Sequence, residues 1–419
     1  MTNMTRIFRT LTSKYPYKEY HPDDKKFTIN ACHWGQLKLF YTELEFLAIC
    51  SKYYDMAKCV VVYVGAAPGN HTEFLTKLFP ELHWILYDPA KFFIERSDKI
   101  EIFTGRDGYF TDATVEQVKK NKRTHGKHIL FISDIRMGND DKDEFEIGVW
   151  NDMIQQQQWA IKLNCTMAML KLRFPYIFDN KVKIDKDYDM SQISDHIKIN
   201  KHYPDSVLSL LYLEGEIFIQ INPPINSTET RLIIRQNPDK TYNMRYYDAK
   251  MYEGQLFYFN TVDRIETEYE YRDSEKLKNH LAGFDNSYDR VSEFYIWSRY
   301  LKYYLKEEYD FDKLVKFIYD LHDFLDKTTH RNILTCKIDT LDKRKLHNKD
   351  KLLENKNVII AESRDMIYTL KNQISLIKYH NEKILDKNEY DTQIRILRNS
   401  AGSIEKIMDK KIMPFLNRK

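Results

Sequence analysis

The sequence has few features of a secreted, zinc-binding or membrane-embedded protein. Its 419 residues include only five cysteines, and no two of them form a C-x-x-C motif. Neither a disulfide framework nor a metal site is therefore expected. No uninterrupted apolar run reaches the length that spans a bilayer, and no signal peptide opens the chain. These absences favour an intracellular protein in a reducing compartment.

Glycine is also scarce, while aromatic residues are abundant. The chain has 12 Gly beside 30 Tyr and 23 Phe. Lysine, asparagine and isoleucine are frequent as well, a composition typical of an AT-rich genome and consistent with a large DNA virus. The length predicts one large or two modest domains.

Charge is unevenly distributed along the chain. The formal net charge is +3, but residues 327–419 contain 21 Lys+Arg and only 12 Asp+Glu. We predict an N-terminal arm over residues 1–30, a main domain over 31–326 and a basic helical extension over 327–419. Helices are expected at 343–372 and 379–413. The extension is either a solvated helical hairpin, which we favour, or a basic arm for RNA or a partner protein.

The most informative local pattern is VYVGAAPG at residues 62–69. An apolar run breaks at Gly65, and a helical pattern begins at Thr72, as in a strand–turn–helix unit that holds an adenosine-bearing cofactor. Gly65 and Gly69 do not have the spacing of the dinucleotide fingerprint, and the P-loop Lys-Ser/Thr is absent. A glycine turn without phosphate-binding residues suits S-adenosylmethionine. A turn in some other βα unit is the alternative.

Two further buried strands end in carboxylates. Residues 83–87 are followed by Asp88, and residues 128–133 are followed by Asp134. An acidic residue about twenty positions after the turn commonly binds ribose hydroxyls in such folds. Because carboxyl ends of parallel strands meet at one edge of a sheet, we expect Asp88 and Asp134 to share a site. For each aspartate taken alone, a turn former or helix cap is the alternative.

The remaining elements are predicted from hydrophobic periodicity. Helices are expected over residues 36–51, 150–162, 292–306 and 313–324. Strands are expected over 164–172 and 231–235, and a strand pair within 207–222 around Glu214-Gly215. Strands alternating with helices predict an α/β fold of the Rossmann-like class.

Several motifs, in order, make the sequence similar to a known family. They are GQLKL (35–39), VYVGAAPG (62–69) with His71, ISDIR (132–136), LKLRFP (170–175), ETRL (229–232) and YE (252–253). Together they resemble the poxvirus cap-specific mRNA (nucleoside-2′-O-)-methyltransferases, which also serve as the regulatory (processivity) subunit of viral poly(A) polymerase. The resemblance implies a Rossmann-like S-adenosylmethionine-dependent methyltransferase fold. It also implies capped mRNA and a poly(A) polymerase catalytic subunit as partners, and a location in the virion and host cytoplasm.

The resemblance implies a catalytic tetrad of Lys38, Asp134, Lys171 and Glu229. Ribose 2′-O-methylation is an in-line displacement at a methyl group, and the barely acidic hydroxyl needs a base or local positive charge. A lysine can act as that base when burial and neighbouring cations favour its neutral form. In this interpretation Lys171 orients and deprotonates the hydroxyl, Asp134 positions Lys171, and Lys38 with Glu229 tunes the charge. A surface ion pair is the alternative for any one of them alone.

The resemblance also implies how S-adenosylmethionine would be held. Its methionine portion would lie against the glycine turn, its ribose against Asp88, and its adenine against Phe110, or against Tyr109 because the preceding residues differ from the family. The predicted cofactor-binding residues are Gln36, Tyr63, Gly65, Ala67, Pro68, Gly69, Asp88, Phe110 and Asp134.

A methylated cap needs a different kind of pocket. N7-methylguanine is a cationic base, best held between two aromatic planes with a carboxylate on its edge. By resemblance, Tyr20 and Tyr176 would stack on the base, Glu253 would read its edge, and Arg173 would contribute to binding the cap or RNA. Phe178 stands where the family has a second carboxylate, so either Asp179 replaces that carboxylate or the base is held differently. For the two tyrosines, stray aromatics in a Tyr-rich chain are the alternative.

The sequence as a whole predicts a cap-specific mRNA ribose 2′-O-methyltransferase acting on the first transcribed nucleotide of N7-methylguanosine-capped RNA. The alternative is an RNA-binding processivity subunit of a viral poly(A) polymerase, alone or as a second role of the same chain. A ribose methyltransferase for rRNA or tRNA is disfavoured by Glu253 in its matching context.

Overall fold

A computed structural model describes residues 5–19, 35–136, 141–176, 194–199, 209–224, 227–264, 267–281, 284 and 286–329. Its centre is an eight-stranded sheet with the strand order β2-β10-β11-β7-β6-β3-β4-β5. The parallel half consists of β3 (Cys59–Val64), β4 (His83–Tyr87), β5 (Ile100–Phe103), β6 (His128–Ser133) and β7 (Met167–Leu172). The antiparallel half consists of β11 (Thr230–Arg235), β10 (Glu216–Phe218) and β2 (Thr10–Leu11).

The sheet has a topological switch point between β3 and β6. From β3 the chain moves outward to β4 and β5, then returns to the other side of β3 as β6 and continues to β7. Val64 at the end of β3 pairs with Ser133 at the end of β6. In open α/β sheets the ligand crevice lies outside the carboxyl ends of the strands at such a point. The α/β, Rossmann-like prediction is therefore confirmed.

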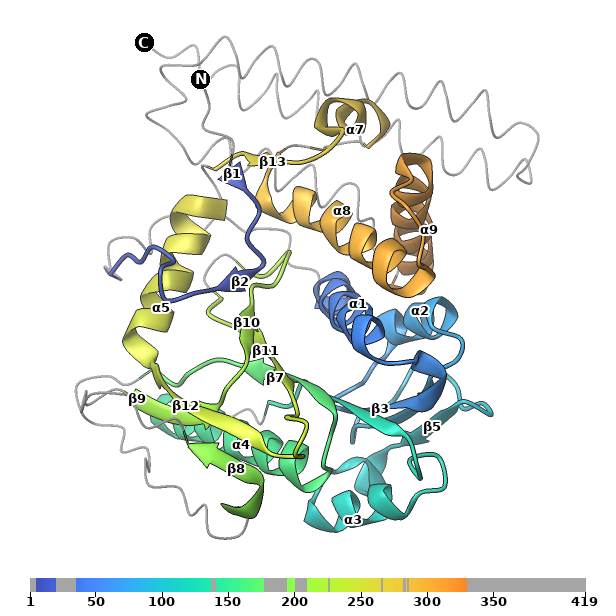
Figure 1. The fold of residues 1–419 in the computed structure, drawn as a ribbon, viewed down its shortest axis with the longest axis vertical. Helices are drawn as coiled ribbons and strands as arrows, with labels where there is room; N and C mark the ends of the chain where they lie inside the picture. Colours follow the sequence, from blue (N-terminus) through green and yellow to red (C-terminus); the bar gives the residue numbers. More distant parts are fainter. Residues whose placement is uncertain are drawn as a thin grey trace.

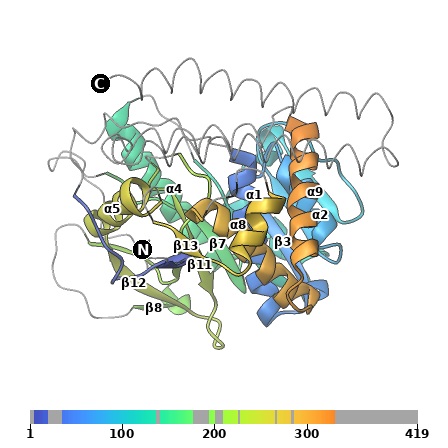
Figure 2. The same ribbon diagram turned by 90° about the horizontal axis from the view of Figure 1, so that it is seen from above.

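Helices cover both faces of the sheet (Figure 1). One face carries α1 (Gly35–Tyr53) and α2 (Asn70–Leu78), with α8 (Tyr288–Tyr300) and α9 (Phe311–Thr329) packed beyond them; α9 runs beside α2 (Figure 2). The other face carries α3 (Asp112–Lys120) and α4 (Lys142–Lys162). Between two helical layers the parallel strands β3, β4, β6 and β7 are almost entirely buried, which explains their continuous apolar runs.

A smaller mixed sheet lies beside the main sheet. It comprises β8 (Ile197–Ile199), β12 (Tyr242–Asp248) and β9 (Ser209–Leu213), followed by α5 (Ala249–Tyr258). In this sheet β12 is parallel to β8 and antiparallel to β9. The N-terminal segment runs along α5: the Lys18 N–H donates to the Gly254 carbonyl at 3.0 Å. The Gln255 amide donates to the carbonyls of Thr12 and Tyr15, both at 2.9 Å. Residues 12–18 of the predicted arm are therefore fixed against α5.

The remaining elements are short. They are β1 (Thr5–Arg6), which pairs with β13 (Tyr269–Glu270), α7 (Ser274–His280), and the helical turns η2 (Met56–Lys58), η3 (Gly105–Gly108), η5 (Ser194–His196), η6 (Phe259–Asp263) and η7 (Leu301–Leu305). Within the ranges given above, no helix is both long and apolar enough to cross a bilayer.

The predicted strand pair within residues 207–222 is wrong in its pairing. Both strands exist, but β9 pairs with β12, whereas β10 pairs with β11 and β2. The link at Gly215 is pressed against β11, since a Cβ there would lie 2.5 Å from the Ile233 carbonyl oxygen. The glycine thus permits a change of sheet rather than a hairpin. Near the C-terminal end, α9 continues to Thr329, past the predicted domain boundary at 326, and the helices predicted at 343–372 and 379–413 lie outside the described residues.

Candidate active site

The glycine turn closes tightly over the switch point. Gly65 follows β3 with a φ of +79°, and a Cβ there would lie 2.8 Å from the Asp134 carbonyl carbon. Its N–H donates to the Tyr87 carbonyl at the end of β4, at 2.9 Å. Gly69 has a φ of +76° and is the N-cap of α2. Both positions need a left-handed backbone, which glycine adopts without strain.

Asp88 ties this turn to the end of β4. One carboxylate oxygen accepts from the Ala67 N–H at 3.1 Å, and the other accepts from the Ala90 N–H at 2.8 Å. An ionised carboxylate offers about four lone-pair sites, so these two bonds leave capacity for a diol. The predicted residues Gly65, Ala67, Pro68, Gly69 and Asp88 therefore come together at one edge of the sheet.

A buried polar chain lies behind the turn. His71, in the first turn of α2, contacts Gln36 Oε1 through Nδ1 at 2.8 Å and Glu43 Oε1 through Nε2 at 2.9 Å. The Tyr63 hydroxyl donates to the same Glu43 oxygen at 2.7 Å. Tyr63 is fully buried, so its side chain faces α1, and any cofactor contact from this residue would come from its backbone. Glu43 and His71 were not predicted as site residues, and they connect the turn to α1.

The predicted adenine contact lies in a more buried place than its neighbour. Phe110 is 7% exposed and packs edge-on against Tyr87 and Trp159, with ring centroids 5.0 Å away in each case. Tyr109 is 62% exposed. Of the two aromatic residues considered as contacts of the adenine base, Tyr109 therefore has the more exposed ring. Which of the two contacts adenine stays a prediction.

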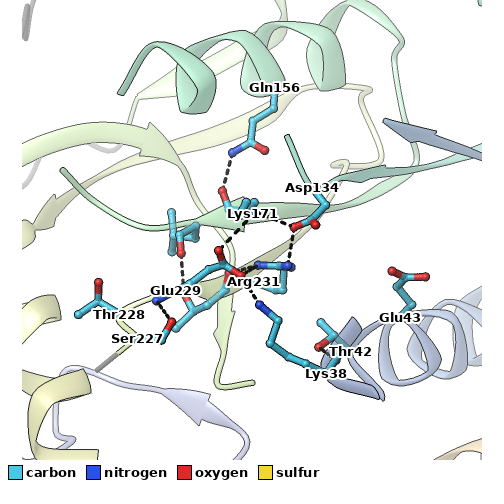
Figure 3. Close-up of polar contacts among 12 residues, drawn as sticks. Lys38, Thr42, Glu43, Asp134, Gln156, Lys171, Ser227, Thr228, Glu229 and Arg231 are labelled. Atoms are coloured by element: carbon cyan, nitrogen blue, oxygen red, sulfur yellow. Dashed lines mark hydrogen bonds and ion pairs between the residues drawn. The ribbon is translucent and has the colours of Figure 1, made fainter. Parts of the chain in front are cut away.

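The four predicted catalytic side chains meet in one cluster, drawn in Figure 3. Lys171 Nζ, on β7, lies 3.1 Å from Asp134 Oδ1 and 3.4 Å from Glu229 Oε2. Lys38 Nζ, on α1, lies 2.8 Å from Glu229 Oε1. The four side chains are 11–16% exposed, so the cluster borders the surface without being freely solvated. Residues almost two hundred positions apart are thus joined by ion pairs at the carboxyl edge of the sheet.

A fifth member, Arg231, was not predicted. It is 1% exposed and donates to Asp134 Oδ1 at 2.6 Å and to Glu229 Oε1 at 2.9 Å. Its cross-strand partner on β7 is Lys171, so the two cations stand side by side on one face. The available signal was an arginine inside an apolar strand two positions after Glu229, because alternate residues of a strand share a face.

Burial and charge together set the protonation of this cluster. Burial lowers the pKa of Lys38, and Arg231 adds to this effect, although Glu229 opposes it. Burial raises the pKa of Asp134, but Lys171 and Arg231 outweigh it, and the net direction is downward. For Glu229, burial is likewise outweighed by Arg231 and the two lysines, so its pKa lies well below the usual range. Both carboxylates are therefore ionised at neutral pH.

Two glutamines hold the cluster from behind. Gln156 of α4 donates to the Lys171 carbonyl at 2.6 Å and to the Tyr212 hydroxyl at 3.1 Å. Gln220 is 1% exposed, and in the amide orientation that satisfies its neighbours it donates to Glu229 at 3.2 Å and accepts from Arg231. Fixed supports of this kind keep reacting groups in place, which an in-line transfer requires.

The predicted cap residues that the structure describes lie together beyond β7. Arg173 stands over the Tyr176 ring, with its guanidinium carbon 4.3 Å from the centroid. Glu146 of α4 accepts from the Arg173 guanidinium at 2.6 Å and from the Tyr176 N–H at 2.7 Å. The Tyr176 hydroxyl is 2.7 Å from Thr228 Oγ1, and Thr228 precedes Glu229 in the chain. Glu146 was not predicted, and it fixes both members of this pair.

Glu253 faces the same region from α5. It is half-buried and interacts electrostatically with Arg173 and Glu146. Burial raises its pKa, and Glu146 adds to this shift, whereas Arg173 opposes it. The N-terminal segment reaches this helix, since a Cβ on Gly254 would lie 3.0 Å from the Tyr17 ring. Tyr20 and Phe178 lie outside the described residues.

Comparison with known proteins identifies the family of this chain. A family model described as poly A polymerase regulatory subunit matches residues 4–313. The chain belongs to this family. The match ends near the start of α9, so it spans the main sheet, the cluster around Lys171 and the helix that carries Glu253.

Relatives of this chain that have established names are viral enzymes. It is 24% identical over 269 residues to the cap-specific mRNA (nucleoside-2′-O-)-methyltransferase of Myxoma virus (strain Lausanne), covering 61% of this chain and 70% of the relative. It is 27% identical over 275 residues to the protein of the same name from Fowlpox virus (strain NVSL), covering 63% and 78%.

A solved structure titled "The structure of bluetongue virus VP4 reveals a multifunctional RNA-capping production-line" is also similar. The identity is 12%, the TM-score is 0.35, and the match covers 95% of this chain and 75% of that chain. This similarity is too distant to support an argument about the site, which rests on its own geometry.

Proposed function

We propose that this protein is an S-adenosylmethionine-dependent mRNA (nucleoside-2′-O-)-methyltransferase. Its substrate is the first transcribed nucleotide of RNA that carries an N7-methylguanosine cap. The observation that carries the proposal is the cluster of Lys38, Asp134, Lys171 and Glu229 beside the glycine turn. The names of the Myxoma and Fowlpox virus relatives support the same reaction.

The residues at the glycine turn fit S-adenosylmethionine. The turn lacks the lysine and serine or threonine of a phosphate site, and Asp88 keeps acceptor capacity for a ribose diol. S-adenosylmethionine would therefore lie along Gly65, Gly69 and Asp88. Its methionine end would point towards Gln36 and its adenine towards Tyr109 or Phe110. When bound, it supplies an electrophilic methyl group on a sulfonium.

The protein's part in the transfer is to prepare the ribose hydroxyl. Lys171 Nζ is held by Asp134 and Glu229, so its position is fixed before the hydroxyl arrives. We propose that Lys171 orients the 2′-hydroxyl and, as the neutral amine, takes its proton while the oxygen attacks, becoming an ammonium that Asp134 and Glu229 stabilise. Lys38 and Arg231 keep both carboxylates ionised and add positive charge where the alkoxide develops.

A second role follows from the family itself. The matching model describes a regulatory subunit of poly(A) polymerase, and we propose that the chain also binds a polymerase catalytic subunit. The ion-paired tetrad supports a dual role over a purely regulatory one, because a purely regulatory subunit has no need for a desolvated Lys-Asp-Lys-Glu cluster.

The test of the proposed function uses three RNAs of one sequence, ending in an N7-methylated cap, an unmethylated cap or a triphosphate. Methyl transfer from labelled S-adenosylmethionine should be fastest on the N7-methylated cap and weak or absent on the triphosphate. Equal transfer to all three would exclude cap specificity, and no transfer to any of them would leave only the regulatory role.

Replacing Asp88 should weaken cofactor binding. In Asp88→Ala the ribose hydroxyls lose their acceptor, which costs about 1–3 kcal/mol of binding free energy for S-adenosylmethionine and S-adenosylhomocysteine. Asp88→Asn, which can still accept from Ala67, should lose less. Calorimetry with both ligands measures the effect, and Asp98→Ala, an exposed carboxylate before β5, is the matched control. Unchanged affinity in Asp88→Ala would remove this residue from the cofactor site.

Replacing Glu253 should erase cap discrimination. The methylated base is cationic, so Glu253→Ala should abolish the preference for N7-methylated over unmethylated caps. Affinity for uncapped RNA should barely change, because that affinity depends on phosphate contacts. Since burial raises the pKa of Glu253, the wild-type preference should weaken as the pH is lowered towards that pKa and the carboxylate is protonated.

Cap-analogue titrations by fluorescence at several pH values measure this preference. Glu275→Ala, whose carboxylate is 86% exposed on α7, is the matched control. An equal loss of capped and uncapped binding in Glu253→Ala would contradict the pocket assignment.

A further inference from the structure

A group of exposed cations with two neighbouring tyrosines lies at the edge of the sheet opposite the active site. We call it the rear patch and define it by Lys52, Tyr53, Arg235, Lys302 and Tyr303. We propose that the rear patch binds single-stranded RNA, separately from the crevice that holds Lys171. This role goes beyond methyl transfer and does not depend on it.

The position of the rear patch follows from strand register. Tyr53 is the last residue of α1, and Arg235 is the last residue of antiparallel β11. Arg235 pairs with Met167, the first residue of β7, whereas Lys171 lies near the other end of that strand. At about 3.3 Å per residue, the register separates Arg235 from the cluster at Lys171 by more than 10 Å along the sheet. The rear patch is therefore distinct from the catalytic crevice.

Segments distant in sequence converge there. The Arg235 guanidinium carbon lies 4.6 Å from the centre of the Tyr53 ring. Lys52 Nζ is 5.2 Å from the same ring and 5.7 Å from the ring of Tyr303, which follows α8. Lys302 Nζ is 5.9 Å from the Tyr303 ring. Cations thus lie beside two rings contributed by different elements.

The cations of the rear patch are available to a ligand. Lys52, Arg235 and Lys302 are all exposed, and in the described part of the chain none of them pairs with a carboxylate. Many other exposed lysines here do have such partners, for example Lys77 with Glu73 at 2.8 Å. Three unneutralised cations in one place attract an anion.

The rings identify which anion fits. Tyr53 is 46% exposed although it is a large aromatic. The rings continue to Tyr54, 6.4 Å from Tyr53, and to His128, 4.8 Å from Tyr54. Single-stranded nucleic acid is bound by such a combination, because bases stack on rings while lysine and arginine neutralise the phosphates. Tyr53 and His128 are exposed, whereas Tyr54 and Tyr303 are half-buried. An acidic protein segment would use the cations but has no need for these aromatic rings.

The test measures binding of uncapped RNA without any methyl donor, so its outcome is independent of the proposed catalysis. The variant is Tyr53→Ala combined with Arg235→Ala, with Arg235→Glu as a second variant. Each is compared with wild type on a long single-stranded RNA and on an RNA of a few nucleotides that fills only the crevice. The control is Arg272→Ala, because Arg272 also stands over a tyrosine, 4.1 Å from the Tyr309 ring, but next to Asp273.

Fluorescence anisotropy should show long-RNA affinity reduced at least fivefold in the double variant, since one stacked base contributes about 1–3 kcal/mol. The slope of the logarithm of the RNA-binding constant against the logarithm of the salt concentration should become shallower by about one unit. Short-RNA binding, methylation of a short capped RNA and the Arg272→Ala control should be unchanged. Unchanged long-RNA affinity in both variants would overturn the proposal, as would an equal loss for long and short RNA. Loss of polymerase-subunit association with normal RNA binding would also overturn it and assign the rear patch to a protein.

Discussion

Lys171→Met should abolish methyl transfer while binding of S-adenosylmethionine and capped RNA persists. Methionine fills a similar volume but cannot accept a proton or stabilise an alkoxide. General-base catalysis contributes roughly 10²–10⁴-fold, so a single-turnover rate at least 100-fold lower is expected. Lys171→Arg should be similarly inactive, because a guanidinium keeps the charge but does not deprotonate in proteins.

The control for this change is Lys198→Met, an exposed lysine on β8 that is paired with Asp239. It should keep the wild-type rate. Single-turnover kinetics with saturating cofactor and RNA separate the chemical step from binding. A rate within a few-fold of wild type in Lys171→Met would show that the cluster does not act through this lysine.

Arg231→Met should reduce both stability and activity. The guanidinium is buried and supplies two short bonds to Asp134 and Glu229. Removing one partner of a buried ion cluster leaves uncompensated charge and costs about 3–5 kcal/mol. The matched control is Arg235→Met on the same strand, because Arg235 is exposed and has no carboxylate partner among the described residues. It should leave the free energy of unfolding nearly unchanged.

The pH dependence of this destabilisation has a defined direction. The pKa values of Asp134 and Glu229 are lowered in the folded chain. Their stabilising effect is therefore present above the ordinary pKa of a carboxyl group and is lost as pH falls through the folded values. Denaturant unfolding at several pH values should show the gap between wild type and Arg231→Met narrowing towards acid pH. If wild type and Arg231→Met had equal free energies of unfolding at neutral pH, Arg231 would not hold the two carboxylates in place.

The elements that build the carboxyl edge of the parallel sheet could be predicted from sequence because their signals are local. The run before Gly65 and the helical pattern after Gly69 define β3 and α2 without information from elsewhere. Asp88 and Asp134 followed from the rule that parallel strands end together. Pairing of β9 and β10 could not be predicted in this way, since it depends on distant partners, β12 and β11.

The cluster of Lys38, Asp134, Lys171 and Glu229 could not be predicted from local sequence patterns alone. Lys38 and Glu229 are 191 positions apart, and only the resemblance to a family joined them before the structure did. Arg231 was missed because the prediction treated its strand as core, and a buried arginine is interpretable only when its carboxylate partners are known. Glu43 and Glu146 were missed for the same reason: each is a helix residue whose buried contacts become visible only in three dimensions.

The measurement that tests the proposed chemistry most directly is the location of the transferred methyl group. Capped RNA is incubated with the wild-type protein and isotopically labelled S-adenosylmethionine, digested to nucleosides and analysed by mass spectrometry, with Lys171→Met as the blank. The predicted result is label on the ribose 2′-oxygen of the first transcribed nucleotide, and none in the blank. Label on a base or on the cap guanine, or equal labelling with Lys171→Met, would contradict the proposed role of the Lys38, Asp134, Lys171 and Glu229 cluster.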